Sequence, residues 1–286
     1  MHLISGRVGV TDGFRGVGSD GDTGQIDEDN DGEFPNNTYR YIVDLPLLLS
    51  EQLGKQLSQM ATYRVNYIQM DLRNVNDQLD NDNSIAIGGT VRWYTPTAHR
   101  VDALQYAREY KRESTGGAVA STDPWGYYTN DSDYKGLRFT WDADSQLDAT
   151  ATTDDTVILS GQYFSMQEMF DHYNRTINGT PEGEGRDTSG EGQALWNTRV
   201  GLDEYDTHYW VTSFVNAELK DGLVNDESIS APRSTPWSWA SDQFHLPVLG
   251  GLMEIEAVHC STDAPGLIED EYYLQVTIGV TGWDEF

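Results

Sequence analysis

Residues 271–280 read E-Y-Y-L-Q-V-T-I-G-V and alternate between large apolar side chains and small or polar ones. The side chains that share one face are Tyr272, Leu274, Val276, Ile278 and Val280. A period of two residues indicates a strand that buries one face and exposes the other. This pattern is typical of antiparallel sheets that pack one face on a core. The stretch therefore predicts a β-protein built from antiparallel sheets.

The same alternation recurs upstream. In residues 251–258, Met253 and Ile255 are predicted to face the core, while Glu254 and Glu256 face outward. Further strands are predicted at 38–45, 62–73, 85–94, 136–141, 155–160 and 207–215. Three segments show helical spacing instead, at 47–61, 97–112 and 165–174. We therefore expect an all-β fold with a few helices laid against β-barrels.

The charge balance is strongly acidic, with 47 Asp and Glu against 18 Lys and Arg and a net charge of −29. Self-repulsion at this charge destabilises a compact chain unless salt screens it. We therefore predict a salt-adapted protein from a halophile or a virus of one. Its melting temperature should rise between about 50 mM and about 2 M NaCl, as thermal unfolding would show, and equal stability at both would contradict this prediction.

Composition also excludes several functions. Direct binding of nucleic acid needs clustered Lys and Arg, and the chain has one short basic patch, at 108–112. No apolar run approaches the roughly 20 residues of a membrane-spanning helix. The six histidines show no metal-ligand spacing, and no nucleophile motif accompanies them. We expect a protein that is not an enzyme.

The acidic run at 27–33 resembles part of a calcium-binding loop. Asp27, Asp29 and Asp31 occupy the first three acidic positions of an EF-hand, and a glycine follows. Thr38 stands where the loop needs a bidentate Glu, and Pro35 interrupts it. The run is therefore not an EF-hand. A solvated acidic loop is one interpretation, and a looser Ca²⁺ site on the three aspartates is the other; no other cofactor is expected.

Two sets of side chains are candidates for contacts between subunits. Trp237 and Trp239 flank one residue of a predicted loop, and Trp is enriched at protein interfaces. The same pair could instead stack on sugar rings. The second set lies on the apolar stripes of the predicted helices and comprises Leu53, Leu57, Leu104 and Tyr110.

Residues 84–108 form a strand that runs into Pro96 and then an amphipathic helix. This block resembles the strand-to-helix segment of double jelly-roll major capsid proteins of icosahedral viruses with an internal membrane. Residues 39–49 and 244–283 are compatible with the opening and closing strands of such barrels. The resemblance is architectural and covers about two thirds of the chain.

The resemblance implies two jelly-roll β-barrels side by side. Residues 1–37 would form an N-terminal strand and the acidic loop, 38–165 the first jelly roll and 166–286 the second. Three chains would form a homotrimer that tiles the capsid of the virion, assembled in the host cytoplasm. Other virion proteins and the internal membrane would be its further partners, although no N-terminal amphipathic helix for membrane contact is evident.

The resemblance thus predicts a major capsid protein that self-assembles into the shell of a virus of a halophilic or marine host. The alternative is a β-sandwich that binds carbohydrate or attaches a virus to its host, with Trp237 and Trp239 as stacking platforms. An extracellular hydrolase of a halophile is a third hypothesis, which the missing catalytic motif disfavours.

Overall fold

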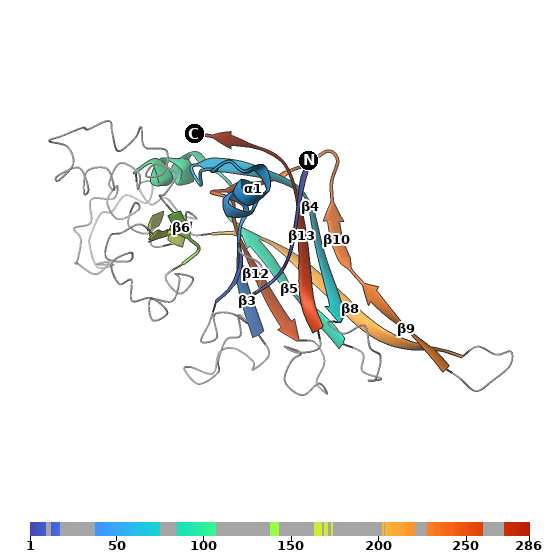
Figure 1. Ribbon diagram of the computed structural model, residues 1–286. Helices are drawn as coiled ribbons and strands as arrows, with labels where there is room; N and C mark the ends of the chain where they lie inside the picture. The colour runs from blue at the N-terminus through green and yellow to red at the C-terminus, as the bar shows by residue number, and fades with distance from the viewer. Residues whose placement is uncertain are drawn as a thin grey trace, which may run out of the picture.

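A computed structural model of the chain describes the ranges 1–9, 13–17, 38–74, 85–106, 138–142, 163–167, 169–170, 173, 202, 204–220, 228–259 and 272–286. These residues form two antiparallel sheets packed face to face, with a smaller mixed element at one end (Figure 1). The all-β prediction with a few helices is confirmed.

Sheet A contains β1 (His2–Arg7), β13 (Tyr272–Glu285), β4 (Ala61–Asn74) and β10 (Trp237–Ala240) in that order, and β11 (Leu246–Leu249) also pairs with β4. Sheet B contains β2 (Phe14–Gly16), β3 (Thr38–Asp44), β12 (Leu252–His259), β5 (Ile85–Trp93), β8 (Asp206–Lys220) and β9 (Ser228–Thr235). The strands β9 and β10 follow one another in the chain, so the path leaves sheet B and enters sheet A at this edge.

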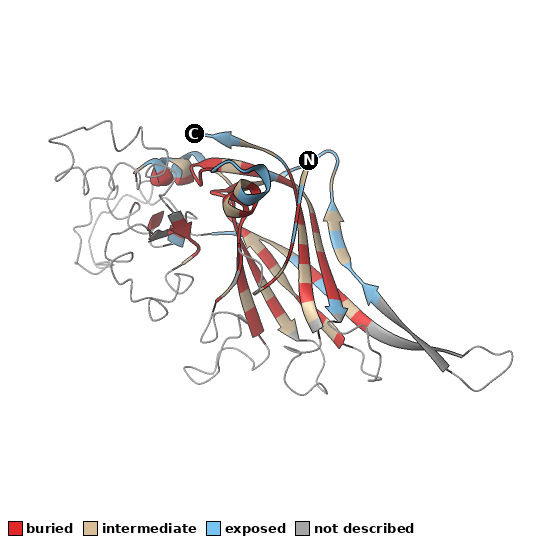
Figure 2. Ribbon diagram, viewed as in Figure 1, coloured by how far each residue is buried: buried red, intermediate tan, exposed pale blue. Residues whose placement is uncertain are grey.

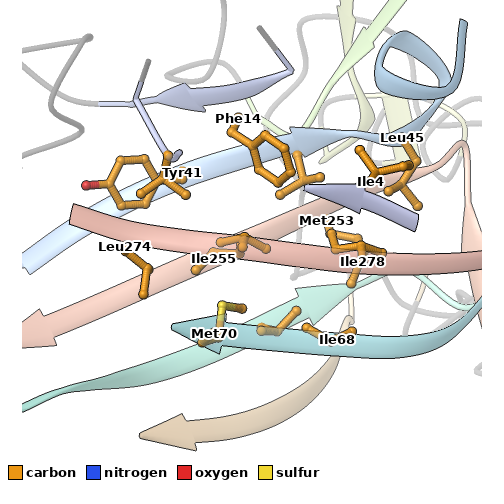
Figure 3. Close-up of a cluster of buried hydrophobic side chains, with 14 of the residues drawn as sticks. Ile4, Phe14, Tyr41, Leu45, Ile68, Met70, Met253, Ile255, Leu274 and Ile278 are labelled. Carbon is orange, nitrogen blue, oxygen red and sulfur yellow. The ribbon is translucent and has the colours of Figure 1, made fainter. Parts of the chain in front are cut away.

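The main core lies between the sheets. In sheet A, Ile278 of β13 pairs with Ile4 of β1 on one side and Ile68 of β4 on the other. Met253 and Ile255 of β12 reach the same core from sheet B (Figure 3). Along β13, the buried residues Leu274, Val276 and Ile278 alternate with less buried ones, as the period-two pattern predicted (Figure 2).

The helix α1 (Leu45–Leu53) is shorter than the predicted helix over 47–61. It begins at Asp44, whose carboxylate accepts a hydrogen bond from the backbone N–H of Leu47 at 3.0 Å. It ends at Gly54, which adopts φ 62° and caps the last turn. Because the helix stops there, the predicted stripe does not continue to residue 61, where β4 begins.

A second apolar cluster lies at one end of the sandwich. It joins residues of the helical segment 98–106, of β6 (Arg138–Thr140) and of 166–173, and β6 pairs in parallel with β7 (Tyr163–Ser165). Tyr94 sits at its centre, stacked on Trp141 and edge-on to Phe170. Gln59 holds β6 in place, because its side-chain amide accepts from the backbone N–H of Phe139 at 2.6 Å and donates to its carbonyl at 3.2 Å.

The described strands do not divide at residue 165. The strand β3 pairs with β12, β4 with β13, and β5 with β8, so strands from 38–165 and 166–286 alternate within the same sheets. Two barrels with a boundary at 165 would require each half to pair within itself. Among the described residues, one sandwich replaces that arrangement.

Most predicted strands lie within a few residues of the observed ones. The observed strands that no predicted strand covers are β2, β7, β9, β10 and β11. The segments 98–106 and 166–173 are helical where the structure describes them. The predicted strand at 155–160 lies outside the described residues.

Candidate interaction surface

The outward face of sheet B carries a largely buried network of charged side chains. Arg40 of β3 pairs with Glu254 of β12 and with Asp142, which follows β6. Arg92 of β5 pairs with Glu254 at 3.1 Å and with Glu256. The side chain of Glu254 is only 3% exposed and is shared by both arginines. The network therefore joins three strands of sheet B to the element at the end of the sandwich.

Electrostatics in this network favour the charged state of its bases. Burial by itself lowers the pKa of Arg40, but the charges and hydrogen bonds of Glu254 and Asp142 outweigh burial and raise that pKa above its ordinary value. The pKa of Arg92 is raised for the same reasons by Glu254 and Glu256, against the opposing effect of burial. Both guanidinium groups therefore remain charged across the neutral range, and the cluster holds two positive against three negative side chains.

Next to this network, the outward face of β8 exposes large apolar side chains. Tyr209 is 79% exposed and Val211 is 57% exposed, and they lie opposite Thr90 and Gly88 of β5. Tyr205, just before β8, is also exposed, and the guanidinium of Arg92 lies 5.2 Å from its ring centre. We call Tyr205, Tyr209 and Val211 the Tyr209 patch. Two exposed apolar residues at i and i+2 on one strand put both on the same face of the sheet.

The two tryptophans that the sequence suggested as interface residues lie on strand β10 and face the interior of the sandwich. Trp237 pairs with Met70 and Trp239 with Ile68, and both partners are fully buried core residues. Trp239 also contacts His208, with ring centres 5.7 Å apart. Both indoles are half-buried against the main core. This register disfavours a flat, exposed platform on which a sugar ring could stack. It places the two tryptophans at an edge of the sandwich and not at the tip of a loop.

The structure places the leucines that were predicted to form subunit contacts in different surroundings. Leu57 is buried in the main core and Leu104 in the second cluster. Their apolar surface is therefore used within the chain, which corrects the prediction that they form contacts between subunits. Leu53 is exposed at the end of α1, and Tyr110 lies outside the described residues.

The candidate calcium ligands Asp27, Asp29 and Asp31 also lie outside the described residues. Within the described part of the chain, no three His, Cys, Asp or Glu side chains are grouped as a metal site would need. In that same part, no helix combines the length and the apolar character needed to cross a membrane.

Sequence reasoning missed both the Arg40–Glu254 network and the Tyr209 patch. The predicted strand over 207–215 placed Tyr209 and Val211 on one face, but local pattern could not show that this face stays uncovered. A patch of this kind can bury apolar surface against another macromolecule. Comparison with protein-family models, curated proteins and solved structures finds no match to this chain.

Proposed function

We propose that the protein is a structural protein that self-assembles into the capsid of a virus of a salt-loving host, and that the Tyr209 patch is a contact between copies. The observation that carries the proposal is the exposed apolar pair Tyr209 and Val211 on a regular sheet of a chain with net charge −29. The proposed partners are further copies, in a trimer and then a lattice, together with other virion proteins.

The strand pairing supports a jelly roll as the finer description of this sandwich. A jelly roll forms when a long antiparallel hairpin of eight strands rolls up, so that the first strand pairs with the last, the second with the seventh and the third with the sixth. Counting from β3, these nested pairs correspond to β3 with β12, β4 with β10 and β11, and β5 with β8. The order β3-β12-β5-β8 in sheet B follows from such rolling.

We therefore propose a single jelly roll for the described strands, in place of the two that the resemblance implied. The outer three nested pairs of the rolled hairpin lie within the described residues. The strands β1, β2, β9 and β13 are additions to these nested pairs. Jelly rolls occur in capsid proteins, lectins and cupins, so the fold alone does not decide the function.

The large negative charge of the chain favours contacts between copies at uncharged parts of the surface. Copies that each carry −29 repel one another over most of their surface, and this repulsion weakens when salt shortens the screening length to about 3 Å at 1 M. An uncharged apolar patch is where two such surfaces can approach at least electrostatic cost. We therefore expect assembly to strengthen as the salt concentration rises.

Replacing both Tyr209 and Val211 with serine tests the proposal. The double variant should shift the protein from oligomer to monomer in light scattering at about 2 M NaCl, because the buried apolar area of the contact is lost. Its thermal stability should be almost unchanged, because both side chains are exposed in the single chain.

The matched control is Phe244→Ser. Phe244 lies between β10 and β11 and is 72% exposed. Its replacement by serine therefore removes a comparable exposed aromatic side chain that lies outside the patch. The control should keep the parent's oligomeric mass. A double variant that assembles as the parent does would remove the Tyr209 patch from the proposal.

A further inference from the structure

A second group of exposed apolar side chains lies at the start of β1, in the opposite sheet, and at the end of α1. Met1 is 67%, Leu3 50% and Leu53 39% exposed. Leu3 lies on the outward face of β1, because its neighbour Ile4 pairs with the buried Ile278. The side-chain amide of Gln52 donates to the carbonyl oxygen of Leu3 at 3.1 Å and so ties the end of α1 to this strand. We call Met1, Leu3 and Leu53 the N-terminal patch.

The sheet around the N-terminal patch differs from the rest of the chain in charge. The register places Leu3, Gly279 and Tyr67 in one outward row, and Ser5, Thr277 and Gln69 in the next. Ser5 and Thr277 hydrogen-bond across the strands at 2.9 Å. Between these rows and the strand ends at Arg7 and Arg73, the outward positions of β1, β13, β4 and β10 carry two basic side chains and one acidic one. The basic side chains are Arg7 and Arg73, and the acidic one is Asp71.

The rim of the Tyr209 patch is acidic, since Arg92, which lies over the Tyr205 ring, is itself paired with Glu254 and Glu256. Glu204 and Asp206 flank Tyr205, and Glu204 is exposed beside it. Each patch thus has an apolar centre, and the charges that surround the two patches are complementary. The patches lie on the outward faces of the two packed sheets. A single chain can present both at once, because the sandwich lies between them.

We propose that the N-terminal patch of one copy binds the Tyr209 patch of the next copy, so that the chains associate head to tail. This inference rests on the proposed self-assembly and specifies its geometry. Head-to-tail contacts close into rings or extend into lattices, whereas a patch that binds its own copy gives a two-fold dimer and stops. A closed shell needs the former kind of contact.

Site-directed cross-linking tests the pairing. Val211→Cys and Leu3→Cys are made as separate proteins in a Cys260→Ser background, because Cys260 is the single native cysteine. One of the two is labelled with ¹⁵N, and they are mixed at high salt with a short thiol-to-thiol reagent. We expect the cross-linked peptide pair to join position 211 of one protein to position 3 of the other. Asp242→Cys, exposed in the turn between β10 and β11, replaces Leu3→Cys in the control mixture and should give only background.

The outcomes separate this inference from the proposed function. Cross-links between two copies of the position-211 variant would overturn the head-to-tail pairing and leave self-assembly through the Tyr209 patch standing. Absence of the 211-to-3 cross-link in protein that light scattering shows to be assembled would also overturn it. Protein that stays monomeric at every salt concentration would overturn both.

Discussion

Replacing Arg40 with methionine should lower the free energy of unfolding by about 3–5 kcal/mol, the usual effect of breaking a buried ion pair from one side. The substitution removes one of the two arginines that pair with the almost fully buried Glu254, and Arg92 remains as the other. The pKa of Arg40 is raised, so its charge is present below and throughout the neutral range and the loss should not vary with pH there. Denaturant unfolding at high salt measures the effect.

The matched control is Arg64→Met. Arg64 and Asp284 form a pair at 3.6 Å with both side chains well exposed. Such pairs contribute about 0–1 kcal/mol and are screened by salt. Adding Glu254→Gln to Arg40→Met should recover part of the loss, because it removes a buried carboxylate that has lost one of its two arginine partners. Equal losses from the Arg40 and Arg64 variants, or no recovery, would contradict the network's role.

Replacing Gly89 with alanine should destabilise the fold by about 3 kcal/mol or more, at the upper end of what overpacking costs. A Cβ at this position would lie 1.8 Å from the backbone carbonyl oxygen of Glu256. Gly89 pairs with Ala257 in the middle of sheet B, so β5 and β12 would have to separate to admit the methyl group. Thermal unfolding, or near-UV circular dichroism if the variant does not fold, measures this.

Gly54→Ala is the comparison. Gly54 caps α1 with φ 62°, and a methyl group on its Cα would have no neighbouring atom within 4 Å. The expected loss is only the cost of a left-handed alanine, about 1–2 kcal/mol. A Gly89 variant as stable as the Gly54 variant would show that the two strands can separate without penalty.

Local pattern predicted the strands well because each depends on its own alternation. Residues 271–280 and 251–258 place their buried faces as expected, and both helix starts and strand starts lie near the predicted positions. The pairing could not be predicted, because β3 and β12 are more than 200 residues apart and nothing local records their contact. Among the described residues, strands from 38–165 therefore pair with strands from 166–286, which the local pattern did not indicate.

The strand β10 was missed because Ser234–Pro236 interrupts the pattern and resembles a turn. Its tryptophans were predicted as interface residues, yet their register with Met70 and Ile68 assigns them to the interior edge. The helix over 47–61 was extended too far because its leucine spacing continues past Gly54. Glu254 was correctly placed on the outward face, but its burial depends on Arg40, Arg92 and Asp142, which arrive from distant parts of the chain.

The most direct test of the central proposal is the molar mass of the parent chain in solution. Light scattering should be recorded from about 50 mM to about 2 M NaCl, a range over which the screening length falls severalfold. We predict masses that are multiples of the 32.0 kDa chain and that grow with salt. A mass of one chain at every salt concentration would contradict the proposal that this protein builds a shell.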